Sequence, residues 1–174
     1  LDDQVEDAHQ RAQKLAAQLS EMRSRAGETL SSAVTQELAA LAMATASLHV
    51  RVITEDVLHA HGADQVQLLL AAHQGADPVA LGKGASGGEL SRVMLALEVV
   101  IAGSDPVPTF VFDEVDAGVG GASALEIGRR LDALSHTSQV IVVTHLAQVA
   151  AFANNHLRVV KDTLGEVTTS SVAV

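Results

Sequence analysis

Two short, largely apolar runs constrain the fold of this chain more than any other feature. Residues 109–112 (TFVF) and 140–143 (VIVV) are four residues each, and both lead directly into polar side chains. Runs of this kind are typical of strands that are buried on both faces of a sheet. The intervening residues 123–134 have helical periodicity, and parallel strands require such a crossover helix. The pattern therefore predicts an α/β fold with a mainly parallel sheet flanked by helices.

Further patterns predict elements on either side of this unit. Residues 48–52 alternate apolar with polar side chains and predict a half-exposed strand, with 66–70 as its antiparallel partner. A helix is expected over residues 90–102, ending before Pro106 and Pro108. The other expected elements are a helix over residues 146–153 and strands over 157–160 and 167–172.

The first part of the chain carries a heptad pattern. Apolar residues recur in alternating steps of four and three, at Leu1, Val5, Ala8, Ala12, Leu15, Leu19, Met22 and Ala26. Such a seam predicts a helix that packs against a partner helix. We expect a coiled-coil helix over residues 1–45 that enters a globular unit over 46–174; an ordinary amphipathic surface helix is the alternative. Because Leu1 already lies inside the pattern, we expect the chain to be a piece of a longer protein.

The composition limits both the core and the function. Apolar residues make up 48% of the 174 residues but aromatic residues only 2%, so we expect a core of Ala, Leu and Val. The absence of cysteine excludes disulfides and thiolate metal sites. A formal net charge of −10 argues against a DNA-binding surface on this chain, because phosphate contacts need clustered Lys and Arg. With no signal peptide and no bilayer-length apolar stretch, a cytoplasmic location without membrane contact is expected.

A glycine-rich segment precedes the helix expected over residues 90–102. Ser86 and Glu89 have the spacing of a capping box, in which each side chain bonds the backbone of the other residue. The box does not explain Gly87 and Gly88, which each cost a helix about 1 kcal/mol relative to alanine. Glycines at a helix N-terminus let an anion approach the backbone N–H groups. The segment therefore predicts a phosphate contact, and the cap can coexist with it.

Polar residues follow both apolar runs. Asp113 and Glu114 come directly after residues 109–112, and His145 follows the second run. Ligands of α/β sheets bind at the carboxyl ends of strands, where one carboxylate can hold Mg²⁺ and its neighbour can deprotonate water. With Asp116 two residues on, we expect three carboxylates to crowd this turn and to favour a cation. The plain alternatives are loop carboxylates that cap a helix and a surface histidine.

Two observations bear on other reaction classes. Residues 84–88 match G-x-S-x-G, and Asp113 and His145 follow in the order of α/β-hydrolases, but residues 81–84 make a poor strand before the serine. The chain contains no G-x-x-x-x-G-K-[ST] phosphate loop. If the chain carries part of a nucleotide-hydrolysing site, that site lacks the phosphate-binding loop within this chain.

Taken together, three segments carry a specific resemblance. Residues 85–102 (ASGGELSRVMLALEVVIA) resemble a signature motif and its helix, and residues 109–121 (TFVFDEVDAGVGG) a Walker B motif and D-loop. Residues 140–156 (VIVVTHLAQVAAFANNH) resemble a switch-histidine segment. In this order they resemble the C-terminal lobe of an ABC-type P-loop ATPase head of the SMC class, and most of all the RecN family of bacterial DNA-repair proteins. The resemblance is strong over residues 81–161, and the heptads fit the returning arm of a coiled coil.

The resemblance implies a role for each motif residue. Glu114 would be the general base, Asp113 would bind Mg²⁺ through water, and His145 would sense the γ-phosphate of ATP. The residues implied to contact ATP bound on an opposite protomer, or to lie at the dimer interface, are Ser86, Gly87, Gly88, Glu89 and Asp116. Ala85 replaces the leucine of many relatives in the wider class, which leaves the phosphate contacts intact.

The resemblance also implies partners and a function. The intact protein would join an N-terminal Walker A lobe, form an ATP-dependent homodimer of heads, and hydrolyse ATP during DNA double-strand-break repair and recombination. It would be nucleoid-associated and would bind DNA mainly outside this chain. Without a Walker A motif the chain alone is expected to be inactive. The alternatives are a non-catalytic SMC-like scaffold and a serine hydrolase that uses Ser86.

Overall fold

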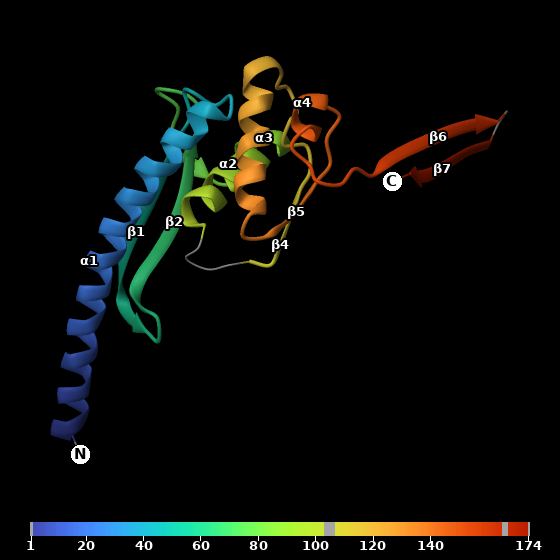
Figure 1. The fold of residues 1–174 in the computed structure, drawn as a ribbon. Coiled ribbons are helices and arrows are strands. Elements are labelled where there is room, and N and C mark those ends of the chain that lie inside the picture. Colours follow the sequence, from blue (N-terminus) through green and yellow to red (C-terminus); the bar gives the residue numbers. More distant parts are fainter. Residues whose placement is uncertain (1, 103–106, 165–166, 174) are drawn as a thin grey trace.

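A long helix and a long hairpin form one arm of the molecule. The computed structural model describes residues 2–102, 107–164 and 167–173, so Leu1 and Pro106 lie outside the described residues. Helix α1 (Asp2–Ala40) runs along strands β1 (Ser47–His59) and β2 (Gly62–Ala71), which pair antiparallel (Figure 1). The expected pairing of residues 48–52 with 66–70 is confirmed, with Val50 opposite Leu68.

Helix α1 covers the outer edge of β1. Ser31 and Thr35 on the helix accept hydrogen bonds from the backbone N–H groups of Val50 (2.9 Å) and Leu48 (3.1 Å). These bonds satisfy donors that an edge strand would otherwise expose. Gly27 makes the close approach possible, because a Cβ there would lie 2.9 Å from Cγ1 of Val50. The helix and the hairpin are therefore held together by side-chain hydrogen bonds to the strand and by close packing at Gly27.

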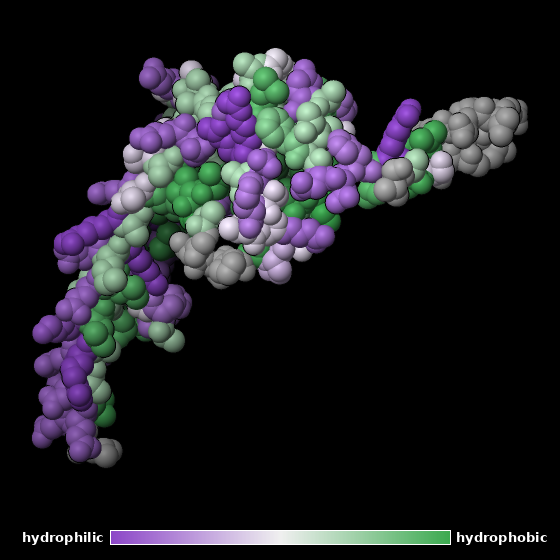
Figure 2. Space-filling model, in the orientation of Figure 1, coloured by the Kyte–Doolittle hydropathy of each residue, from purple (hydrophilic) through white to green (hydrophobic). Residues whose placement is uncertain are grey.

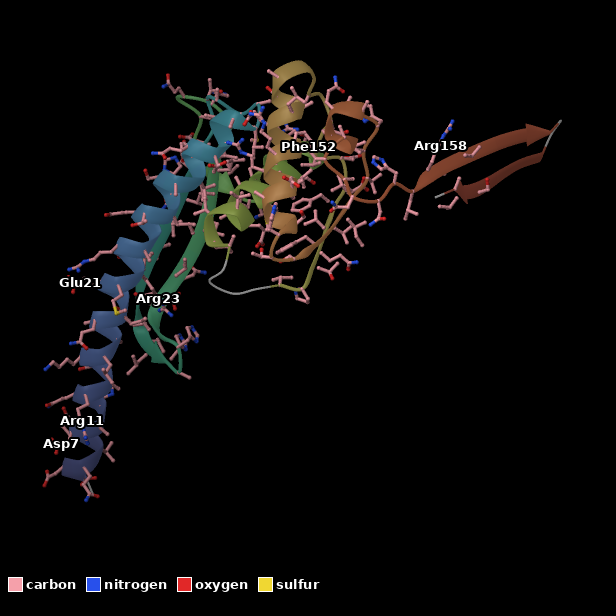
Figure 3. All side chains as sticks on the ribbon, viewed as in Figure 1. Asp7, Arg11, Glu21, Arg23, Phe152 and Arg158 are labelled. Atoms are coloured by element: carbon pink, nitrogen blue, oxygen red, sulfur yellow. The ribbon has the colours of Figure 1, made fainter. Side chains whose placement is uncertain are left out.

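A buried carboxylate joins α1 to the hairpin farther along. Asp64 on β2 accepts hydrogen bonds from Ser20 (2.6 Å), Arg23 (3.0 Å) and Thr54 (3.1 Å). Arg23, labelled in Figure 3, also donates to the carbonyl oxygen of His61 (2.8 Å) at the hairpin tip. The hydrogen bond from Ser20 and those from Arg23 and Thr54 lower the pKa of Asp64 despite its burial. This carboxylate stays ionised and fixes the angle between helix and hairpin.

The globular part is built around one strand–helix–strand unit. Strands β4 (Thr109–Phe112) and β5 (Gln139–Val142) pair in parallel through the crossover helix α3 (Gly121–Ser135). Helix α2 (Gly87–Ile101) packs beside α3 and α1, and α4 (Ala147–Ala150) is a single turn after β5. The expected α/β unit is confirmed. One core joins it to the arm; its fully buried members include Val34, Leu38, Leu41, Leu48, Val93, Leu95, Val115 and Ile127.

The sheets differ from the expected mainly parallel arrangement. The described residues form three separate sheets, β1-β2-β3, β4-β5 and β6-β7, and only β4-β5 is parallel. Strand β3 is Val79–Ala80, and the terminal hairpin of β6 (Arg158–Leu164) and β7 (Val167–Ala173) extends from the body (Figure 1). Short connections join β1 to β2 and β6 to β7, and such connections allow only antiparallel pairing.

The expected heptad seam only partly overlaps the face of α1 that packs on the hairpin, since Leu19 of the seam is half-buried beside Gly62 of β2. Ala16, Gly27, Val34 and Leu38 are the buried residues, whereas Leu15 and Met22 of the seam are 65% and 67% exposed. Hydrophilic side chains cover the outer edge of this helix in Figure 2. None of the helices among the described residues is long and apolar enough to cross a membrane.

Candidate functional site

The glycine-rich segment forms the N-terminus of α2. Ser86 is the N-cap, and its hydroxyl accepts a hydrogen bond from the backbone N–H of Glu89 (3.3 Å). The Glu89 carboxylate in turn accepts from the backbone N–H (2.8 Å) and the hydroxyl (2.9 Å) of Ser86. The backbone hydrogen bond from Ser86, with that from its hydroxyl, lowers the pKa of Glu89. The predicted capping box is confirmed, and the Glu89 side chain serves the cap.

Gly87 and Gly88 lie against the turn that follows β4. A Cβ on Gly87 would lie 2.8 Å from Oε2 of Glu114. A Cβ on Gly88 would lie 2.8 Å from both the Glu114 carbonyl oxygen and the Ala117 Cβ. Gly88 has no room for a side chain because the backbone at Glu114 blocks it, and its lack of a Cβ lets the first turn of α2 touch the turn over residues 113–117. At Gly87 the near atom is the end of the flexible Glu114 side chain, which can shift.

The turn over residues 113–117 has an unusual backbone. Glu114 has a φ of 56°, in the left-handed region that a side chain disfavours, and its carbonyl oxygen accepts from the Ala117 N–H (2.9 Å). The Asp113 carbonyl oxygen accepts from the Ser91 hydroxyl of α2 (2.7 Å). Both Asp113 and Glu114 are exposed. Two carboxylates are thus presented to solvent at the carboxyl end of β4.

Asp116 points the other way. Its side chain is 2% exposed and accepts hydrogen bonds from the Thr144 hydroxyl and from the backbone N–H of His145 (3.3 Å). The Nδ1 atom of His145 lies 3.4 Å from the same carboxylate oxygen, and the His145 side chain is 73% exposed. The expected crowding of three carboxylates is therefore wrong, since the bonds to Thr144 and His145 turn Asp116 inward. In this single chain the Asp116 carboxylate bonds to Thr144 and His145, and its contact with ATP or a second head stays a prediction.

Sequence reasoning missed Arg92. This residue of α2 is 6% exposed, and its Nη1 atom donates to the carbonyl oxygens of Ala117 (3.0 Å) and Val115 (3.4 Å). Burial lowers the pKa of Arg92, and the nearby charge of Glu89 partly opposes this. The only signal in the sequence is a basic residue among the apolar positions of residues 90–102.

The structure brings the three motif segments together within one chain. The first turn of α2 contacts the turn over residues 113–117, and Asp116 of that turn binds the segment Thr144–His145. Among the described residues, no group of three or more His, Asp or Glu side chains is placed to hold a metal ion by itself. Any metal here would need ligands from outside these side chains.

The geometry does not favour a serine hydrolase. Ser86 has φ and ψ of −66° and 162°, which is ordinary extended backbone and not the strained turn of a nucleophile elbow. Within the part of the chain that the structure describes, its hydroxyl is bonded to Glu89 and no histidine bonds to it. Among the described residues, the Ser86 hydroxyl thus lacks the histidine partner of a Ser-His-Asp hydrolase.

The comparisons with known proteins fit these motifs. A family profile described as "RecF/RecN/SMC N terminal domain" matches residues 37–168. The chain belongs to the RecF/RecN/SMC family. The matched residues include the first turn of α2, the turn over residues 113–117 and His145.

Similar proteins include bacterial DNA-repair proteins. The chain is 56% identical to DNA repair protein RecN of Streptomyces coelicolor over 173 residues, which cover 92% of the chain and 30% of that protein. It is 46% identical to RecN of Mycobacterium leprae, over 90% of the chain and 30% of that protein. With RecN of Xylella fastidiosa the identity is 41%, over 100% of the chain and 32% of that protein. The chain thus spans about a third of the length of these relatives.

Solved structures support the fold. The Smc head domain of Pyrococcus furiosus, with an extended coiled coil and bound to the C-terminal domain of ScpA, has a TM-score of 0.56 and 20% identity, over 92% of this chain and 38% of that chain. The Smc head domain of Pyrococcus yayanosii, with a coiled coil and joint, also has a TM-score of 0.56, at 21% identity, over 85% of this chain and 27% of that one. The described elements therefore have the α/β fold of SMC head domains.

Proposed function

We propose that this chain is the C-terminal lobe of a RecN-like ATPase head with the end of its coiled coil attached. In this proposal residues 1–45 are the returning coiled-coil helix and residues 46–174 are the lobe. The matching profile bears the name of an N-terminal domain, whereas the proposal rests on three segments that resemble signature, Walker B and switch-histidine motifs and on the lack of a phosphate-loop sequence in the chain. The observation that carries the proposal is the contact of these three segments around the turn over residues 113–117.

Each polar group near this turn has a proposed task. Glu114 is the general base, and its exposed carboxylate at the end of β4 can accept a proton from the attacking water. His145, on the neighbouring strand end, contacts the γ-phosphate. The N–H groups of Gly87 and Gly88 have no partner within the helix and bind the phosphate of ATP held by a second head. Ser86 and Glu89 shape that helix terminus through the capping box.

The donor set fits Mg²⁺ bound together with a nucleotide. This ion keeps several waters and uses one or two carboxylates plus substrate phosphates. Asp113 supplies one exposed carboxylate at the end of β4, which agrees with the lack of a metal cluster among the described side chains. When bound, the ion neutralises charge on the phosphates. Asp113 would hold it through water beside Glu114.

Two exposed apolar surfaces support the proposed partners. Val111, Ile141 and Val143 on the β4-β5 pair are 67%, 46% and 58% exposed, which is unusual for a two-stranded parallel sheet. We propose that an N-terminal lobe with the Walker A motif covers this surface. The exposed seam residues Leu15 and Met22 of α1 are assigned to the partner helix of the coiled coil.

In the intact protein, two heads would dimerise around ATP and separate after hydrolysis. We place this cycle in DNA double-strand-break repair and recombination, in the cytoplasm at the nucleoid, in keeping with the RecN relatives. The net charge of −10 places DNA contacts mainly outside this chain. Alone, the chain is proposed to hydrolyse no ATP.

The variant Glu114→Gln in the intact protein tests the catalytic assignment. Glutamine keeps the size and the backbone of this residue but cannot accept the proton of water. ATP turnover is expected to fall about 10²–10⁴-fold. An ATP-bound dimer should accumulate, visible by size-exclusion chromatography with light scattering. Glu28→Gln, an exposed position on α1, is the control and should leave turnover unchanged.

The competing functions give different results. Unchanged turnover in Glu114→Gln would remove Glu114 from the chemistry. A scaffold without catalysis would show no ATPase activity even when this chain is mixed with the missing N-terminal lobe, with or without DNA. Labelling of Ser86 by a fluorophosphonate probe would instead support the hydrolase.

A further inference from the structure

Arg92 is a buried cation, and no ion pair to it is found among the described residues. The charge of Glu89 acts on the guanidinium without direct contact, and the Nε atom is buried with no hydrogen-bond partner. Its hydrogen bonds run from Nη1 to the carbonyl oxygens of Ala117 and Val115. Burying an arginine without a carboxylate is costly, and an apolar side chain of similar volume would stabilise a core position at least as well. The position therefore has a purpose other than packing.

The contacts of Arg92 belong to one face of α2. Gly88, Ser91 and Arg92 are spaced i, i+3 and i+4, so their side chains project from the same side of the helix. All three touch the turn over residues 113–117: Gly88 through its lack of a Cβ, Ser91 through the Asp113 carbonyl oxygen, and Arg92 through the two carbonyl oxygens farther on. Of these three residues, Arg92 lies farthest from the N-terminus of α2, and it bonds the part of the turn that follows Glu114.

The turn needs such support. Glu114 holds a left-handed backbone conformation, which is unfavourable for a residue with a side chain and persists only where its surroundings determine it. On one side, Asp116 is fixed by Thr144 and His145. On the other side, the carbonyl oxygens of the residues flanking Asp116 are fixed by Arg92.

We infer that Arg92 is a positioning residue that fixes the turn over residues 113–117 to α2 and so aligns Glu114 with the glycine-rich helix terminus. The inference rests on the proposed function in that Glu114 is taken as the base. Movement of α2 is then passed to Glu114 through a cation bound to two backbone carbonyl oxygens. A group that contacts ATP at the first turn of α2 thereby influences the base on its own chain.

Two substitutions in the intact protein test this role. Arg92→Met keeps the apolar stem and removes the hydrogen bonds, and Arg92→Lys keeps the charge and one donor. We expect Arg92→Met to lower kcat for ATP about 10–100-fold with little change in KM, because a displacement near 1 Å misaligns a base by about that factor. Arg92→Lys should recover part of kcat. Arg129→Met, at an exposed arginine of α3, is the matched control and should keep wild-type kinetics.

Hydrogen exchange provides a measurement that needs no turnover. The amides of Ala117 and Val119 are bonded to the carbonyl oxygens of Glu114 (2.9 Å) and Asp116 (3.1 Å). In Arg92→Met these two amides should exchange faster while amides of α3 and of the β1-β2 hairpin stay protected. The Arg129→Met variant should show wild-type exchange throughout.

The outcomes separate this inference from the proposed function. Unchanged kcat and unchanged exchange of Ala117 and Val119 in Arg92→Met would overturn the positioning role. A general loss of protection with lost ATP binding in both Arg92 variants would also overturn it, because it would show a purely structural residue. If the wild-type protein hydrolyses no ATP, the proposed function fails, and faster exchange confined to the turn still supports the role of Arg92.

Discussion

Asp116 joins the turn after β4 to the end of β5. It accepts hydrogen bonds from the Thr144 hydroxyl and the His145 backbone N–H while 2% exposed. Asp116→Ala would remove the acceptor of both donors at a part-buried site. Because an unsatisfied buried group costs about 1–3 kcal/mol and these donors are only partly buried, the free energy of unfolding should fall by about 1–3 kcal/mol in total. Urea denaturation followed by circular dichroism measures the loss.

A double-mutant cycle provides the control for this residue. Thr144→Val removes the hydroxyl donor and keeps the shape of the side chain. If the contact forms, the effects of Asp116→Ala and Thr144→Val should be non-additive, with a coupling energy of about 0.5–3 kcal/mol. Strictly additive losses would mean that the two side chains do not interact.

For individual residues, the sequence predicts well which ones lie near the site. It predicts less well the direction in which their side chains point. The spacing of Asp113, Glu114 and Asp116 predicts carboxylates after a strand, and the structure places them there. It does not reveal that Asp116 turns inward, because its partner Thr144 lies 28 residues away in the chain. Arg92 is missed for the same reason, since its acceptors are backbone groups of a distant turn.

Gly27 controls how closely α1 approaches the hairpin. Alanine is favoured over glycine in a helix by about 1 kcal/mol. Here a Cβ would lie 2.9 Å from Cγ1 and 3.2 Å from Cβ of Val50, whose β-branched side chain has little freedom to move. Because overpacking costs about 1–3 kcal/mol, Gly27→Ala should lower the free energy of unfolding by about 1 kcal/mol net. Thermal denaturation detects this as a lower Tm.

The side chain at position 50 decides the size of the effect. In a Val50→Ala background Cγ1 is removed and only the 3.2 Å approach to Cβ remains, so the same Gly27→Ala change should lower the free energy of unfolding less or not at all. A destabilising effect of equal size in both backgrounds would show that helix and strand do not touch at this point.

Elements with strong periodicity are predicted well, and those defined by distant contacts are not. Residues 109–112 and 140–143 form β4 and, nearly, β5, and 123–134 falls within α3. The helix expected over residues 146–153 is reduced to α4. The two-residue strand β3 is too short to show a sequence pattern, and it forms only because it pairs with β2. Likewise, the contact with the hairpin determines which residues of α1 are buried, and the heptad pattern alone does not predict them.

Over the whole molecule, apolar surfaces remain exposed on both the arm and the globular part. Leu15 and Met22 lie on α1 away from the hairpin, and Val111 and Val143 lie on the β4-β5 pair. A chain with 48% apolar residues and one continuous core has no need to leave such residues outside unless a partner covers them. The sequence indicates the first surface through its heptads but not the second, because both faces of β4 and β5 are expected to be buried.

The heptad surface can be tested with glutamates at positions 15 and 22. In this chain alone, Leu15→Glu with Met22→Glu should change the free energy of unfolding by no more than about 0.5 kcal/mol, because both side chains are exposed. In the intact protein the same pair should open the coiled coil, since charges at seam positions prevent helix pairing. Limited proteolysis should then cleave the arm faster. Ala17→Glu with Ser24→Glu has the same spacing of seven on another exposed face of α1, and should leave the arm protected. Equal cleavage in both double variants would mean that no helix packs on the seam.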